Sequence, residues 1–157
     1  MEMFQTMAGV KLLPVHYKGA TPALMDVIAG HIQMMFLSVG SAMPSQQSGK
    51  IRMIAVASKN RIPQLPDIPT VAESGLTDFE AVSWFGLFAP AGTPYEIVVK
   101  LNAEVQRILN DPVFRQKILE PQLFTPMTGS PEEFAAYVRA DVQKWSRVLR
   151  AANVKIE

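Results

Sequence analysis

The sequence predicts an α/β fold in which a parallel sheet occupies residues 9–80 and helices follow it. Short apolar segments rich in β-branched and aromatic residues alternate there with segments that carry helix start and stop signals. The connections are short, as in β-α-β units, which form parallel sheets with right-handed crossovers. Beyond about residue 90 only helix patterns remain. The chain therefore divides into a βα part and a helical part.

Composition excludes several classes of protein. The 157 residues, 48% of them hydrophobic, suffice for one domain or for one piece of a two-domain protein. The formal net charge of +1 gives no reason to expect a nucleic acid or an anionic membrane as a partner. The absence of cysteine excludes disulfides, thiolate metal sites and a cysteine nucleophile.

The first eight residues are expected to be the end of a helix that begins upstream. Phe4 and Met7 lie at helical spacing, and Gly9 suits the stop. The N-terminus lacks the basic and long apolar segments of a signal peptide. The apolar runs of the chain are too short to cross a bilayer.

Residues 9–80 are expected to form the βα part. Thr21 and Pro22 suit the N-cap and first position of a helix that ends at Gly30. A short helix should run from Met43 and end at Gly49. A proline-rich loop follows the sheet, and Thr70 with Glu73 is then expected to form the capping box of one short helix that ends at Gly75. The expected strands are residues 10–17, 31–39 and 51–57, with a further strand at 80–88.

The last third is expected to be helical. Thr93-Pro94 and Asp111-Pro112 each combine a cap residue with proline at the first helical position. Ser130-Pro131-Glu132-Glu133 is a capping box before a long amphipathic helix. A module boundary or a crossover is expected where the pattern changes, near residue 90.

No catalytic pattern is evident. His16 and His31 are the only histidines, and no nucleophile elbow accompanies them. Both are interpreted as lying at strand ends and forming local hydrogen bonds. No glycine-rich phosphate loop is present, so no cofactor is expected. The scattered aspartates, Asp26 among them, are interpreted as capping or solvated groups. An enzyme is therefore not expected.

The segment Tyr17-Lys18-Gly19-Ala20-Thr21 is the strongest candidate for a binding site. It joins the carboxyl end of an expected parallel strand to a helix N-terminus, where ligands bind in open α/β sheets. A helix N-terminus offers free N–H groups and a partial positive charge, which favour an anion such as a carboxylate. An ordinary βα turn would have the same sequence, so both interpretations stay open. The loop at Ser38 would open on the same edge of the sheet.

Several motifs in family order resemble the substrate-binding proteins of tripartite tricarboxylate transporters, the Bug family. The most specific is the stretch from Ser83 to Pro94, and the resemblance extends over nearly the whole chain. The other motifs are Tyr17-Lys18-Gly19 with Pro22-Ala23-Leu24, Gln33-Met34-Met35-Phe36, Ser41-Ala42-Met43-Pro44 with Gly49-Lys50, Pro66 to Leu76, and Ser130 to Phe134 with Trp145.

The resemblance implies a periplasmic binding protein of type II with two α/β domains that close on a small carboxylated solute. It implies delivery to membrane transporter subunits or a signalling partner, and a periplasmic location. Family members are about twice this length, and the chain resembles their C-terminal half. Residues 1–8 would end an upstream helix, residues 9–80 would be the ligand-binding second lobe, and residues 81–157 would be the crossover strand and C-terminal helices of the first lobe.

The expected ligand contacts follow from the motif. Gly19, Ala20 and Thr21 would donate hydrogen bonds to one carboxylate, and Tyr17 would line the wall of the pocket. Lys18 is expected to be solvated, while Ser38 and Ser83 are secondary polar candidates. The alternative is a truncated module that binds no ligand and self-associates. Because the C-terminal helices carry apolar faces, we expect a homodimer or a domain-swapped assembly.

Overall fold

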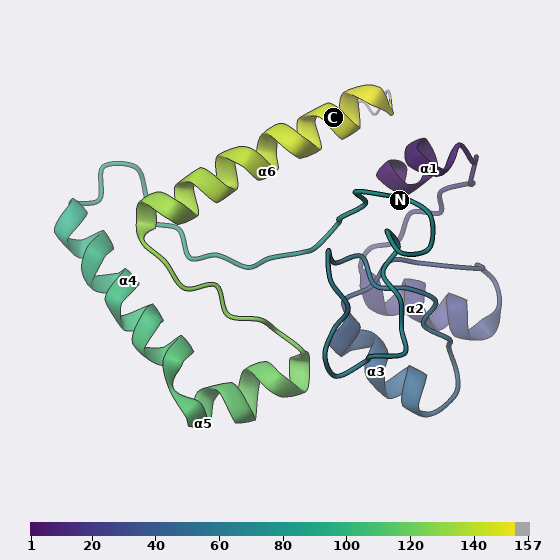
Figure 1. Cartoon of the computed structure of the whole chain (residues 1–157), viewed down its shortest axis with the longest axis horizontal. Coiled ribbons are helices and arrows are strands. Elements are labelled where there is room, and N and C mark those ends of the chain that lie inside the picture. The colour runs from purple at the N-terminus through teal and green to yellow at the C-terminus, as the bar shows by residue number, and fades with distance from the viewer. Residues whose placement is uncertain (153–157) are drawn as a thin grey trace. The chain divides into compact units, whose positions relative to one another are not determined.

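The computed structural model describes residues 1–152 as helices joined by extended segments and turns (Figure 1). The helices are α1 (Glu2–Ala8), α2 (Ala20–Ala29), α3 (Val39–Gln47), α4 (Tyr95–Asn110), α5 (Pro112–Phe114), the π-helix η1 (Arg115–Leu119), the 3₁₀-helix η2 (Glu120–Gln122) and α6 (Pro131–Ala151). The chain forms two compact units. The first unit comprises Met1–Ser83 with the end of α6 from Val148, and the second comprises Trp84–Arg147.

The parallel sheet expected in residues 9–80 is not confirmed. Within residues 1–152 the structure has a single isolated parallel bridge, between Val56 and Thr70. The segment 51–57 comes closest to a strand, because Val56 N–H donates to Pro69 O and Ala81 N–H donates to Ala57 O. The parallel sheet therefore stays a prediction.

The expected strands, 51–57 included, use some of their N–H groups locally. Leu12 N–H donates to the side-chain oxygen of Gln5, and Met53 N–H donates to that of Gln46. The N–H groups of His31 and Ile32 both donate to Asp26 O, in the helix that precedes them. Such bonds compete with a strand ladder, because a donor that is satisfied nearby is not free for a neighbouring strand.

Three of the expected helix starts need correction. Helix α4 begins at Tyr95 with Pro94 as its N-cap, rather than at Pro94 with Thr93 as the cap. Helix α2 begins at Ala20 rather than after Thr21, with Gly19 as its N-cap, so Thr21 lies inside the helix. Helix α3 begins at Val39, the residue expected to end the second strand. The β-branched side chain of Val39 favours a strand only weakly, and tertiary context overrides such preferences.

Both capping boxes are confirmed by reciprocal hydrogen bonds. Thr70 N–H donates to Glu73 Oε2 at 2.7 Å, and Glu73 N–H donates to Thr70 Oγ1 at 3.0 Å. This box closes a turn rather than the helix expected there. The second box joins Ser130 and Glu133 at the start of α6. Gly9 ends α1 in a left-handed conformation, as expected.

The core of the first unit is small and centres on Phe79. Phe79 is 2% exposed, and its ring lies 6.2 Å from that of Phe4 and 6.1 Å from that of Phe36. Val56 and Val71 are buried in the same unit. Aromatic rings at such separations attract one another beyond the benefit of burial. Through this cluster α1 packs against the segment before α3, which contains Phe36, and against the segment after the Thr70 turn, which contains Phe79.

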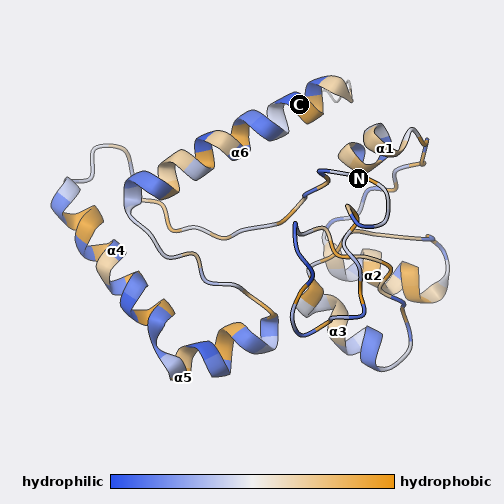
Figure 2. Cartoon of the chain, viewed as in Figure 1, coloured by the Kyte–Doolittle hydropathy of each residue, from blue (hydrophilic) through white to orange (hydrophobic). Residues whose placement is uncertain are grey.

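An aromatic cluster organises the second unit. The Trp84 ring lies 5.6 Å from that of Phe134 and 5.9 Å from that of Tyr137, both on α6. Trp84 Nε1–H donates to Asp141 Oδ2 at 2.9 Å, also on α6. Figure 2 shows apolar and polar residues alternating along α4 and α6, as expected of amphipathic helices. The extended segment at Trp84 therefore packs against the aromatic residues of α6.

Candidate functional site

The expected anion site lies at the N-terminus of α2. Lys18, Gly19, Ala20 and Thr21 are exposed, whereas Tyr17 is half-buried. The first N–H groups of a helix have no acceptor within the helix, so those of Ala20 and Thr21 are available to a ligand. Gly19 has φ 139°, a conformation that residues with a side chain rarely adopt. The exposed backbone therefore presents amides to an incoming group.

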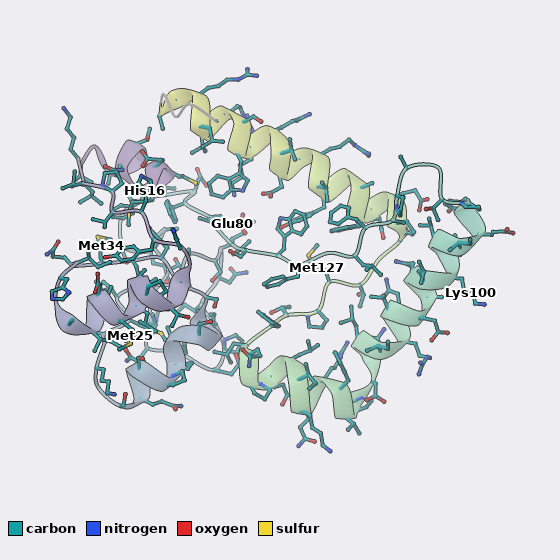
Figure 3. All side chains as sticks on the ribbon, turned by 180° about the vertical axis from the view of Figure 1, so that it is seen from behind. His16, Met25, Met34, Glu80, Lys100 and Met127 are labelled. Carbon is teal, nitrogen blue, oxygen red and sulfur yellow. The ribbon has the colours of Figure 1, made fainter. Side chains whose placement is uncertain are left out.

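Asp26 holds Tyr17 from inside α2. Tyr17 Oη–H donates to Asp26 Oδ2 at 2.6 Å. Helical side chains lean toward the N-terminus, so Asp26 reaches back over the first turn of α2 to the segment that enters it. In Figure 3, Met25 is labelled beside this position on α2.

The other carboxylate oxygen of Asp26 contacts His31. His31 Nδ1 lies 3.1 Å from Asp26 Oδ1, and His31 N–H donates to Asp26 O at 2.8 Å. Because an ionised carboxylate only accepts hydrogen bonds, Nδ1 carries the proton in this contact. Asp26 thus joins the segment before α2 to the segment after it.

Sequence reasoning missed this role of Asp26, which was interpreted as a capping or solvated group. The available signal was spacing: Asp26 lies one helical turn after Pro22, on the side of the helix that the incoming chain follows. For His31 the expected local hydrogen bond is confirmed, with Asp26 as its partner.

These hydrogen bonds shift two pKa values in opposite directions. The Tyr17 hydroxyl, and then His31, stabilise the charged form of Asp26 and lower the pKa of its carboxyl. The same contact with Asp26 raises the pKa of Tyr17, because an ionised phenol could not donate to a carboxylate.

The two shifts predict how stability changes with pH. The pKa of Asp26 is lower in the folded chain, so its contribution is present above the unfolded value of about 3.9 and is lost as the pH falls through the folded value. The pKa of Tyr17 is higher in the folded chain, so its contribution is present below about 10 and is lost as the pH rises through the folded value.

Melting temperatures measured from pH 2 to pH 11 test this prediction. We expect Asp26→Asn to melt below the parent chain near pH 7 and the two curves to converge in acid. Curves that stay parallel from neutral to acid pH would contradict the assignment of the acid transition to Asp26.

The two serine candidates are not joined to the α2 site. Ser38 is exposed at the N-cap of α3, and its hydroxyl donates to Ser41 Oγ at 2.7 Å. Ser83 is exposed at the end of the first unit. Among the described residues no hydrogen bond connects either serine to residues 17–21. The structure therefore groups Tyr17 to Thr21 with Asp26 and leaves the serines apart.

Two further findings concern other types of site. In residues 1–152, no group of three or more acidic, histidine or cysteine side chains is placed to hold a metal ion. None of the described helices is both long and apolar enough to span a bilayer.

Comparison with known proteins places the chain among binding proteins. Residues 1–154 match the family model described as the tripartite tricarboxylate transporter family receptor. A protein encoded in the tcbD-tcbE intergenic region of Pseudomonas sp. strain P51 is 37% identical over 143 residues, which are 90% of this chain and 42% of that protein.

Three solved structures are similar along nearly the whole chain. An R. palustris protein solved with adipate has a TM-score of 0.86 and 36% identity, over 97% of this chain and 50% of that one. The periplasmic binding protein BugD has a TM-score of 0.78 and 32% identity, over 99% of this chain and 52% of that one. MatC from Rhodopseudomonas palustris, with bound malate, has a TM-score of 0.77 and 32% identity, over 94% and 51%. The chain thus spans about half the length of these proteins.

Proposed function

The chain belongs to the tripartite tricarboxylate transporter receptor family, and on this premise we propose that it binds a small carboxylated metabolite for tripartite tricarboxylate transport or sensing. The family consists of solute-binding receptors rather than enzymes. One observation carries the proposal above all: a protein solved with adipate shares the fold of 97% of this chain at 36% identity. MatC, solved with malate, supports the same class of ligand.

The chemistry of the α2 N-terminus suits a carboxylate. The N–H groups of Gly19, Ala20 and Thr21 would donate to the two oxygens of one carboxylate, and the α2 dipole adds a partial positive charge. Each hydrogen bond to a charged group contributes about 1.5–3 kcal/mol. In this proposal Tyr17 lines the wall of the site and Lys18 remains solvated. Ser38 and Ser83 are further polar contacts.

Titration with adipate, followed by amide NMR of the ¹⁵N-labelled chain, tests the function. We expect saturable shifts that centre on residues 17–21, with adipamide, the uncharged diamide, as the control that gives none. Malate and a monocarboxylate in parallel would rank ligand classes. Saturable shifts elsewhere, with residues 17–21 silent, would move the site; no saturable shift with any carboxylate would overturn the function.

Gly19→Val tests the contribution of the backbone directly. Valine disfavours φ 139°, so the amides of residues 19–21 should turn away from the ligand, and affinity should fall at least about tenfold. Gly49→Val is the matched control, because Gly49 also has a positive φ and open space around it but lies after α3. Calorimetric titration of both variants measures the effect. Equal losses of affinity would contradict a specific role for Gly19.

Location and partners follow from the family in this proposal. The similarity to a periplasmic binding protein supports a periplasmic location, and the receptor family supports transporter subunits as the partners that receive the solute. Nucleic acid is not proposed as a partner, because the net charge is only +1.

A self-associating module is the second candidate, and the exposed apolar residues of α4 favour it. Figure 2 shows both apolar and polar residues along α4, and Figure 3 labels Lys100 on it. Ile97, Leu101 and Ile108 are each at least 40% exposed, and their spacing of four and seven residues places them on one side of the helix. Large exposed apolar patches mark interfaces. A homodimer or domain-swapped assembly would cover them.

Sedimentation velocity at micromolar concentration tests the second candidate. A dimer that Leu101→Glu converts to monomer would support it. A monomeric parent chain would exclude it without affecting the carboxylate proposal.

A further inference from the structure

Asp26 contacts the candidate loop at Tyr17, before α2, and also contacts the segment that follows α2, at His31 and Ile32. Its Oδ2 accepts from Tyr17 Oη–H at 2.6 Å, and its Oδ1 lies 3.1 Å from His31 Nδ1. Its backbone oxygen accepts from the N–H groups of His31 and Ile32 at 2.8 and 3.3 Å. Each carboxylate oxygen therefore has its own partner, and the carboxylate cannot turn without breaking one of these hydrogen bonds.

We propose that Asp26 is a positioning residue that holds the backbone of residues 17–21 in place through Tyr17, and this inference rests on the proposed function for the role of that backbone in binding. Asp26 itself faces Tyr17 and His31, so a carboxylate ligand at Gly19–Thr21 would not be repelled by direct contact with it. Asp26 acts on the site through Tyr17 and the backbone of residues 17–21.

The placement of Tyr17 explains why such a restraint matters. Residues 18–21 are exposed, and in the described residues no hydrogen bond outside α2 itself is made by Lys18, Gly19, Ala20 or Thr21. Tyr17 is thus the nearest residue before α2 that is fastened by its side chain. Glycine at position 19 leaves the backbone free to swing unless the chain before it is held.

A double-mutant comparison of Tyr17 and Asp26 distinguishes a positioning role of Asp26 from a purely structural one. If Asp26 acts through Tyr17, removing the Tyr17 hydroxyl and removing the Asp26 carboxylate disable the same contact. The double variant should then lose no more backbone order at residues 19–21, and no more adipate affinity, than either single variant does, as in a double-mutant cycle for coupled groups. If Asp26 only stabilises α2, the two losses should add.

The first arm of the experiment needs no ligand. Backbone ¹⁵N relaxation is measured by NMR in the whole chain and in Asp26→Ala, Tyr17→Phe and the double variant. We expect lower order parameters at Gly19, Ala20 and Thr21 in all three variants, to the same extent. Asp26→Asn, which keeps one acceptor oxygen, should recover part of the order. Asp67→Asn removes an exposed carboxylate elsewhere and should change nothing at these amides.

Two kinds of result would overturn the proposal. Unchanged order parameters at residues 19–21 in Asp26→Ala would show that the carboxylate does not hold them. Additive effects in the double variant would show that it does not act through Tyr17. Should Asp26→Ala fail to fold, Tyr17→Phe against the parent chain still decides, because unchanged order parameters in that variant overturn the proposal equally.

The second arm measures adipate affinity in the same proteins. We expect a loss of roughly five- to tenfold in each single variant and no further loss in the double variant. A parent chain that does not bind adipate would count against the proposed function alone, since the relaxation arm decides the role of Asp26 without ligand. Normal affinity in Asp26→Ala, with a parent chain that binds, would overturn the link between positioning and binding.

Discussion

Replacing Phe79 by alanine is expected to destabilise the chain by about 3–5 kcal/mol. Phe79 is 2% exposed, and Phe4 and Phe36 both pack against its ring. The substitution removes the largest fully buried side chain and leaves a cavity that these neighbours can fill only in part. The free energy of unfolding of globular proteins is typically about 5–15 kcal/mol. The substitution would therefore remove a large part of it, and the variant should unfold at a lower urea concentration.

Urea unfolding followed by circular dichroism measures this effect. Phe85→Ala is the matched control, because Phe85 is 84% exposed and its ring packs against that of Phe124. We expect it to cost about 1 kcal/mol or less. Equal costs for the two variants would show that Phe79 is not the centre of the core.

Gly86→Ala is expected to destabilise the second unit by about 1–3 kcal/mol. A β-carbon at position 86 would collide with Phe134 Cζ and would lie 3.0 Å from Phe134 Cε1 and 3.2 Å from Trp84 Cζ3. The Phe134 ring cannot move away freely, because Trp84 and Phe88 pack against it. Glycine is thus needed here for close approach rather than for an unusual backbone angle.

A second substitution gives this prediction its control. Phe134→Leu removes the two atoms that the new β-carbon would meet most closely, so Gly86→Ala should cost less in the Phe134→Leu background than in the parent chain. Thermal unfolding followed by tryptophan fluorescence reports on Trp84 in the cluster. An equal cost in both backgrounds would show that the collision is not the cause.

The elements that the sequence predicted well are those with local signals. The Ser130–Glu133 box marks the start of α6, Asp111 caps α5 through Phe114 N–H, and Gly9 ends α1. Each signal lies within a few residues of the bond that it forms, so a single stretch of chain contains the whole interaction.

The sheet and the candidate site depend on partners that are distant in sequence, and here prediction was less complete. The apolar character of residues 51–57 does not specify which segment they pair with, and within residues 1–152 the single bridge that they form joins Val56 to Thr70. The Thr21-Pro22 signal predicted the start of the helix after the candidate loop to within two residues, since α2 begins at Ala20 with Gly19 as its N-cap. The contact of Tyr17 with Asp26 could not be predicted, because it requires knowing how the chain approaches the helix.

The extended segment after Ser83 has a practical consequence for handling the protein. Phe85 and Leu87 are 84% and 66% exposed and lie outside any helix. Exposed chain without regular structure is where proteases cut first, because the backbone can enter the enzyme's cleft. Chymotrypsin, which prefers aromatic and large apolar residues, should therefore nick the native chain here before it attacks the helices. Mass spectrometry of a brief digest would then find a first fragment that ends at Phe85 or Leu87.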